Sequence, residues 1–227
     1  MSSKTIYKMK ENKTKGKIVL FDLDGTLIDS TEAILESFEY AYKTFSQKVP
    51  CDEDIKSWIG LPLNLMFIKL GIDESKAQDY VNAYKAHYRT IHTQKTTLLP
   101  LAKEAVLLAH TYARLGIVTT KTSEYSRILL EHFDLMQYFD VLIGKEDVSN
   151  PKPHPEPIQK ALYALGYRFG EVTYMIGDTM ADVESAERAD IASVAVLSGY
   201  MKKEDLEDEA DFVTNNAYEA VELIENI

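Results

Sequence analysis

Apolar residues change their spacing along the chain, and the changes divide it into three stretches. The first ends in the unbroken run IVLF at residues 18–21, which predicts a strand buried on both faces. Over residues 30–98 the apolar positions recur every three or four residues, which is typical of amphipathic helices. From Leu99 onward, short runs of strand-forming residues alternate with helical patterns. We therefore expect a sheet combined with a block of helices.

The block of residues 30–98 predicts helices and no strand. Ser30 or Thr31 is a suitable N-cap for its first helix. A glycine and a proline interrupt the pattern in the middle of the block, and a longer helix is expected over about residues 75–92. Because the block lies between the first strand and the next helix, it reads as an insertion.

The alternation after Leu99 predicts a parallel sheet, because strands that alternate with helices require right-handed crossover connections. Helices are predicted at residues 101–114, 123–132, 156–165, 180–189 and the C-terminus, and strands at 115–119, 141–143, 172–176, 192–196 and near 212–213. The fold class is therefore α/β, with a doubly wound parallel sheet. We expect a split core, residues 1–29 and 98–227, and an all-α cap, residues 30–97.

Composition narrows the possible partners of the protein. A chain of 227 residues, 45% of them hydrophobic, can bury a substantial core. The formal net charge of -11 argues against nucleic acid or an anionic membrane as the main partner, because both require a basic surface. Residues 1–17 differ, with six lysines and one glutamate, and we expect this start to be solvated. Its role is left open.

The single cysteine, Cys51, excludes an internal disulfide and agrees with a reducing compartment. No apolar segment approaches the roughly 18 residues that a membrane-spanning helix needs. The Lys-rich start is not followed by the apolar stretch of a secretion signal. We therefore expect a cytoplasmic protein, monomeric or weakly dimeric.

Two carboxylates, Asp22 and Asp24, follow the first strand and precede Gly25 and Thr26. Glycine allows the backbone to turn, so that both carboxylates could face one point. Such a point suits Mg²⁺, which takes few oxygen ligands from the protein and leaves room for phosphate. The plainer alternative is an ordinary Asp-Gly turn at the end of a strand.

Three further strand ends carry polar residues. Thr119 and Thr120 end the second core strand, Lys152 follows the third, and Asp178 ends the fourth, with Asp182 one helical turn later. Ligands of an open parallel sheet bind beyond the carboxyl ends of its strands, so these residues are expected to lie together. Each has a plainer interpretation when taken alone: a helix cap, a solvated loop residue or a strand residue. Their order and placement favour a shared site.

Taken in order, these residues resemble the four motifs of the haloacid dehalogenase (HAD) superfamily of aspartate-nucleophile phosphatases, whose first motif is Asp-x-Asp-Gly-Thr. The all-helical insertion is similar in position and length to the cap of the phosphoglycolate phosphatase-like subfamily, so the resemblance covers almost the whole chain. It implies a HAD-like α/β core with a helical cap. One position departs: related phosphatases usually have Asn where this chain has Thr120. The departure concerns only the finer positioning of phosphate.

The resemblance implies roles for the four acidic residues. Asp22 would be the nucleophile that takes the phosphoryl group as an aspartyl-phosphate, which divides one hard displacement into two easier ones. Asp24 would protonate the leaving alcohol and then activate the hydrolytic water. Mg²⁺ would be held by Asp22, Asp178 and the backbone carbonyl of Asp24, with Asp182 in support.

The resemblance also implies contacts to the phosphoryl group. Lys152 would supply a fixed positive charge and Thr119 a hydroxyl, both matched to the charge on the phosphoryl oxygens. The remaining motif positions would support the site: Gly25, Thr26 and Thr120.

Hydrolysis of a small phosphomonoester is the reaction that we expect. Asp24 and Asp178 argue against a dehalogenase of the same superfamily, which needs neither an acid at the second Asp position nor Mg²⁺. A phosphonate hydrolase of the superfamily forms a Schiff base with a cap lysine and lacks the second Asp, so Asp24 argues against that reaction as well. The cap segment Gly60, Leu61 and Pro62 resembles the specificity loop of phosphoglycolate phosphatase-like and pyrophosphatase-like members. Phosphoglycolate is the first expected substrate, followed by pyrophosphate or a nucleoside monophosphate. A β-phosphoglucomutase-like phosphomutase remains an alternative, and a non-catalytic phosphometabolite sensor a more distant one.

Overall fold

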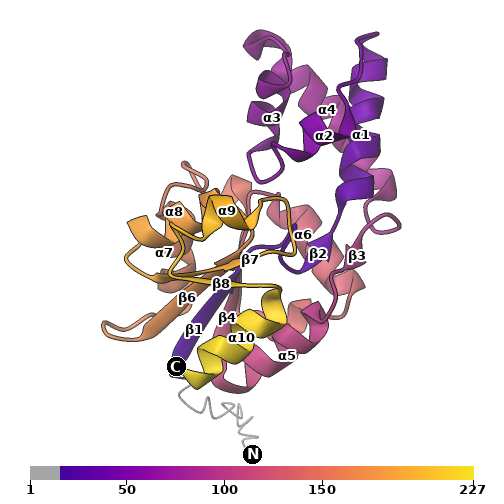
Figure 1. Cartoon of the computed structure of the whole chain (residues 1–227). Helices are drawn as coiled ribbons and strands as arrows, with labels where there is room; N and C mark the ends of the chain where they lie inside the picture. The colour runs from indigo at the N-terminus through magenta and orange to yellow at the C-terminus, as the bar shows by residue number, and fades with distance from the viewer. Residues whose placement is uncertain (1–15) are drawn as a thin grey trace, which may run out of the picture.

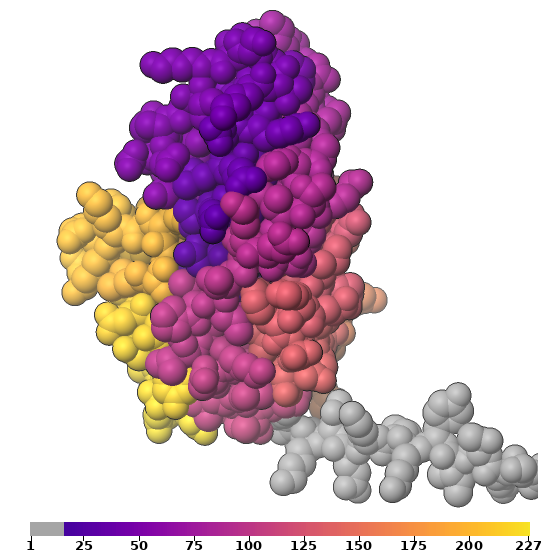
Figure 2. All heavy atoms as spheres, turned by 90° about the vertical axis from the view of Figure 1, so that its right-hand side faces the viewer, coloured from indigo at the N-terminus to yellow at the C-terminus, as the bar shows by residue number. Residues whose placement is uncertain are grey.

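The computed structural model describes residues 16–227, so most of the Lys-rich start lies outside the described residues. The chain forms a sheet part and a helical part, which Figure 1 shows one above the other. The space-filling view in Figure 2 shows the same division, with the N-terminal helical residues stacked above the rest of the molecule.

Six parallel strands form the main sheet (Figure 1). Their order is β5 (Val141–Ile143), β4 (Ala113–Val118), β1 (Lys17–Phe21), β6 (Val172–Gly177), β7 (Ala192–Val196) and β8 (Phe212–Thr214). β1 lies between β4 and β6, and its residues 18–21 are completely buried. This central position explains why β1 is apolar on both faces.

Helices cover both faces of this sheet. One face packs against α5 (Ala102–Tyr112), α6 (Ser123–His132) and α10 (Ala217–Asn226), and the other against α7 (Glu156–Ala164) and α8 (Met180–Arg188). Val19 and Phe21 of β1 point into the first core, and Ile18 and Leu20 into the second. The prediction of a doubly wound α/β fold is therefore confirmed. Short helical segments complete the sheet part: α9 (Lys203–Leu206) and the 3₁₀ turns η1 (Met136–Tyr138) and η2 (Lys145–Asp147).

The helical part consists of α1 (Thr31–Thr44), α2 (Asp52–Lys56), α3 (Leu63–Lys69) and α4 (Glu74–Ile91). These helices share an aromatic core, in which the ring centroids of Phe38 and Phe67 lie 4.6 Å apart. The regularly spaced Tyr80, Tyr84 and Tyr88 of α4 are buried in this core. Within residues 16–227, no helix is both long and apolar enough to cross a membrane.

Two differences from the sequence-based expectations arise at element boundaries. The block of residues 30–98 was expected to hold no strand, but β3 (Thr97–Leu98) pairs antiparallel with β2 (Ile28–Asp29). A two-residue strand has no periodicity that a sequence pattern could reveal. In addition, α5 ends at Tyr112, because Ala113 already adopts an extended conformation and pairs with Lys17 of β1.

Candidate active site

The turn after β1 carries the first two carboxylates. The backbone N–H of Asp22 donates to the carbonyl of Ile176 at 2.8 Å, which ties this residue to the end of β6. Gly25 adopts a φ of 80°, and a Cβ there would lie 2.3 Å from Oδ2 of Asp178. Both constraints require glycine at position 25, because the turn packs directly on the next carboxylate.

Asp178 follows β6 and is completely buried. It accepts hydrogen bonds from the Thr26 hydroxyl at 3.3 Å and from the backbone N–H of Tyr200 at 3.0 Å. Thr26 therefore links the turn after β1 to the residue that follows β6. The helix after Asp178 is capped by another residue: Thr179 is its N-cap, and Oδ2 of Asp182 accepts from the Thr179 N–H at 3.1 Å and from its hydroxyl at 2.7 Å. The Asp178 side chain therefore does not cap this helix, whereas one carboxylate oxygen of Asp182 is used for the hydrogen bonds to Thr179.

The ammonium of Lys152 lies between two of the carboxylates. Nζ is 2.9 Å from Oδ1 of Asp22, contacts Oδ1 of Asp182, and donates to the carbonyl of Val118 at 3.0 Å. The residue is only 3% exposed, so this charge is compensated by the protein and not by water. Thr119, also buried, directly follows β4, and its hydroxyl oxygen accepts from the N–H of Lys121 at 3.2 Å.

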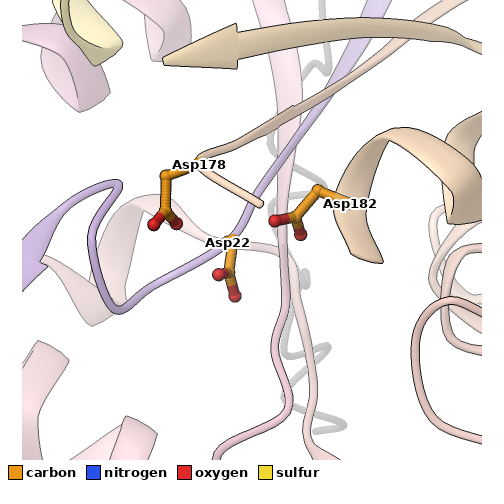
Figure 3. A group of neighbouring side chains, drawn as sticks. All are labelled: Asp22, Asp178 and Asp182. Atoms are coloured by element: carbon orange, nitrogen blue, oxygen red, sulfur yellow. The ribbon is translucent and has the colours of Figure 1, made fainter. Parts of the chain in front are cut away.

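Asp22, Asp178 and Asp182 form an acidic triad, in which one oxygen of each lies within 4.8 Å of the others. Figure 3 shows that they gather in one place, Asp22 and Asp178 from loops and Asp182 from a helix, α8. Burial raises the pKa of Asp22 from 3.8 to about 7, against the lowering effect of Lys152, and Asp182 and Asp24 raise it further. Burial, followed by Asp22 and Asp182, raises the pKa of Asp178 well above its usual value. When they are ionised, three carboxylates against one ammonium leave excess negative charge, which suits a hard divalent cation with oxygen ligands.

The sequence matches a known family over most of its length. Residues 19–196 fit the family model described as haloacid dehalogenase-like hydrolase. The chain belongs to this family.

Relatives of this haloacid dehalogenase-like hydrolase include named phosphatases. The pyrophosphatase PpaX of Oceanobacillus iheyensis is 36% identical over 181 residues, covering 79% of this chain and 83% of the relative. The phosphoglycolate phosphatase of Aquifex aeolicus is 30% identical over 213 residues, which cover 92% of this chain and 97% of the relative. A solved structure described as a predicted phosphatase from Clostridium acetobutylicum is 27% identical, with a TM-score of 0.84 and coverage of 93% and 99%.

Two residues beside Asp24 of this HAD-like hydrolase had no site role in the sequence-based prediction. The hydroxyl of Ser30 donates to Oδ1 of Asp24, and Nζ of Lys121 lies 3.0 Å from Oδ2. Ser30 is the N-cap residue of α1, as expected, but its side chain caps no helix N–H. Lys121 had a usable signal, because it stands two residues after Thr119 at a strand end. Ser30 had none, since its contact with Asp24 depends on the fold of the turn.

A cavity of about 280 Å³ lies between the helical part and the sheet part. Asp24 and Thr120 line it from the sheet part, and Gly60 and Leu61 from the helical part. Pro62, the third residue of the predicted specificity segment, is not among its lining residues and is instead buried at the N-cap of α3. A Cβ at Gly60 would lie 3.0 Å from the side chain of Thr179, the residue after Asp178, so this segment of the helical part packs directly beside the acidic triad.

Proposed function

We propose that this protein is a Mg²⁺-dependent phosphatase that hydrolyses a small phosphorylated metabolite through an aspartyl-phosphate at Asp22. The observation that carries the proposal is the buried acidic triad at the carboxyl edge of the sheet, where Lys152 is the one cation that pairs with it among residues 16–227. Asp22, Asp178 and the backbone carbonyl of Asp24 would hold the ion, supported by Asp182. When bound, Mg²⁺ supplies the positive charge that lets an anionic phosphate enter a site built from carboxylates.

Asp22 and Asp24 would share the two chemical steps. A carboxylate oxygen of Asp22 attacks phosphorus, the bond from phosphorus to the leaving oxygen breaks, and Asp24 gives that oxygen a proton. Water then attacks the phosphorus of the aspartyl-phosphate while Asp24 takes up its proton, which releases inorganic phosphate and restores Asp22. The ammonium of Lys152, already 2.9 Å from Asp22, would face the transferring group, and so would the hydroxyl of Thr119.

The helical part would act as a cap over this chemistry. We propose that residues 30–97 move as one unit relative to residues 1–29 and 98–227, with hinges at 29–30 and 97–100. The short β2–β3 ribbon lies where the chain enters and leaves the helices, which supports hinges at these points. Closure would exclude water during the first step and admit it for the second.

The named activities of the relatives support a small substrate. One relative is a pyrophosphatase and another a phosphoglycolate phosphatase, so phosphoglycolate and pyrophosphate are the first two candidates for this chain. Nucleoside monophosphates are the third. All three carry a phosphoryl group on a leaving oxygen that Asp24 could protonate.

Phosphate release tests the proposed function. We expect the protein to release inorganic phosphate from p-nitrophenyl phosphate, phosphoglycolate or pyrophosphate with millimolar Mg²⁺, and excess EDTA to lower the rate at least about 100-fold. A colorimetric phosphate assay over this panel measures the rate of release and the effect of EDTA. Glucose 1-phosphate is included, together with an assay for mutase activity. Equal rates with Mg²⁺ and EDTA would refute the metal dependence, and conversion of sugar phosphate without release would indicate a mutase.

The raised pKa values predict how Mg²⁺ stabilises the fold at different pH. Asp22 of the folded protein binds its proton up to about pH 7, whereas the unfolded chain releases it near 3.8, so this group's contribution to stability falls as pH rises between these values. Mg²⁺ requires the deprotonated carboxylates. We expect saturating Mg²⁺ to raise Tm by about 5 °C at pH 8 and by less than about half of that at pH 5.

Differential scanning fluorimetry at the two pH values measures this difference. Asp178→Asn is the matched control, since it removes one proposed ligand and is expected to lose most of the Mg²⁺ effect at pH 8. A Mg²⁺ effect that is equal at both pH values, or larger at pH 5, would contradict the prediction.

A further inference from the structure

Lys121 is a largely buried cation that the proposed reaction leaves unused. Its side chain is 10% exposed, and Nζ lies 3.0 Å from Oδ2 of Asp24 and 3.0 Å from the hydroxyl of Tyr88. The ammonium also lies 4.8 Å from the centroid of the Tyr88 ring. Contacts from the sheet part and from α4 therefore hold this charge at one place beside Asp24.

The cavity that contains Lys121 has a charge opposite to that of the whole chain. Among the described residues that line it, three are lysines, Lys85, Lys121 and Lys145, and Asp24 is the only acidic one. The whole chain has 36 acidic residues against 25 Lys and Arg. Much of the remaining lining is apolar or aromatic, as with Ile34, and such walls strengthen an ion pair by keeping water away. The cavity therefore favours an anionic occupant.

Lys152 and Lys121 pair with different carboxylates of the site. Lys152 contacts Asp22, the proposed nucleophile, and is not a lining residue of the cavity. Lys121 contacts Asp24, the proposed acid, and does line it. Because Asp24 must reach the leaving oxygen, the cavity beside it is where the rest of the leaving group would lie.

We propose that Lys121 selects substrates whose leaving group carries its own negative charge, a carboxylate or a phosphate, and that this cavity is the pocket for that group. The inference rests on the proposed phosphatase function and adds a specificity-determining residue to it. Lys121 lies in the sheet part, on the loop after β4, and Lys85 of α4 adds positive charge from the helical part.

Paired substrates of nearly equal size separate this role from simple positioning of Asp24. Phosphoglycolate and 2-hydroxyethyl phosphate differ mainly in the charge of the leaving group, a carboxylate in one and a neutral hydroxyl in the other. We expect Lys121→Met to lower kcat/KM for phosphoglycolate about 30-fold, mainly through KM, and for 2-hydroxyethyl phosphate less than about 3-fold. Pyrophosphate is tested in the same way. If Lys121→Met lowers kcat/KM for pyrophosphate, Lys121 binds a phosphate in the leaving group; if it lowers kcat/KM for phosphoglycolate, Lys121 binds a carboxylate.

Controls keep the test independent of folding. Lys43→Met removes an exposed lysine of α1 that pairs with Glu39, and it should change neither substrate's kinetics. Lys121→Arg should recover part of the preference for the charged leaving group, and Lys121→Gln replaces Lys121→Met if the latter does not fold. An equal loss on charged and neutral substrates would show that Lys121 acts only through Asp24 and would overturn the proposal. A wild-type protein that does not discriminate between them would also overturn it.

A binding measurement separates this inference from the proposed function. Calorimetric titration of phosphoglycolate and pyrophosphate, with Mg²⁺, into Asp22→Asn and into Asp22→Asn/Lys121→Met requires no turnover. We expect the second variant to bind at least one of the two ligands about 30-fold more weakly. If the wild type releases no phosphate from any substrate, the phosphatase proposal fails, while this titration still decides whether Lys121 binds the anion. Equal affinities in the two variants would refute the role of Lys121.

Discussion

Asp22→Asn is expected to lower Mg²⁺-dependent phosphate release by at least about 1,000-fold and to leave the protein folded. The amide has nearly the same shape as the carboxylate but cannot act as the nucleophile. It also removes one charge from the acidic triad, in which Asp182 raises the pKa of Asp22 and Asp22 raises the pKa of Asp178. Without Mg²⁺ at pH 8, we therefore expect the variant to unfold at a temperature no lower than that of the wild type.

Phosphate assays and thermal unfolding, run on the same preparation, measure both effects. Asp208→Asn is a suitable control, because this carboxylate is exposed and far along the chain from the strand-end motifs. Residual activity within about tenfold of the wild type would refute Asp22 as nucleophile. A marked drop in the unfolding temperature would instead contradict the view that the triad carries excess negative charge.

Lys152→Met is expected to have the largest combined effect on stability and activity. The substitution leaves Asp22 and Asp182 buried without their cation, and it removes the donor to the Val118 carbonyl. Breaking a buried pair from one side costs roughly 3–5 kcal/mol of unfolding free energy. Loss of the charge that is proposed to face the phosphoryl group should lower kcat at least about 100-fold.

Urea unfolding at pH 8 and pH 5 measures the stability effect. The loss should be smaller at pH 5, because the remaining carboxylates can take up protons where no ammonium compensates them. Lys43→Met, which removes an exposed partner of Glu39, should change the midpoint little. A loss below about 1 kcal/mol for Lys152→Met, or a larger loss at pH 5, would contradict this account.

Local pattern was sufficient for most of the fold. The apolar run of β1 indicated a strand buried on both faces, and the structure places it in the middle of the sheet with residues 18–21 completely buried. Alternating helices and strands after Leu99 indicated the doubly wound arrangement. These patterns are visible in a single sequence because burial determines the spacing of apolar residues: a strand buried on two faces is continuously apolar, and a helix buried on one face is apolar at every third or fourth position.

Boundaries and short elements were less predictable. α5 ends at Tyr112 because Ala113 pairs with Lys17, a residue that the helical pattern does not include. Likewise, β3 exists only because Leu98 meets Ile28 across the entrance to the helical part. In each case a distant partner, and not the local periodicity, determines the backbone conformation.

The sequence by itself determined the candidate residues, because Asp22, Thr119 and Asp178 directly follow apolar runs and Lys152 comes in the loop after the third strand. The tertiary structure alone decided how they meet. Strand order brings Asp22 beside Asp178, and Lys152 reaches Asp22 and Asp182 from a loop. The pairing of Lys121 with Asp24, residues 97 positions apart, also appears only in three dimensions. Hydrophobic periodicity records which side of an element is buried, whereas contacts between charged groups depend on which elements become neighbours in space.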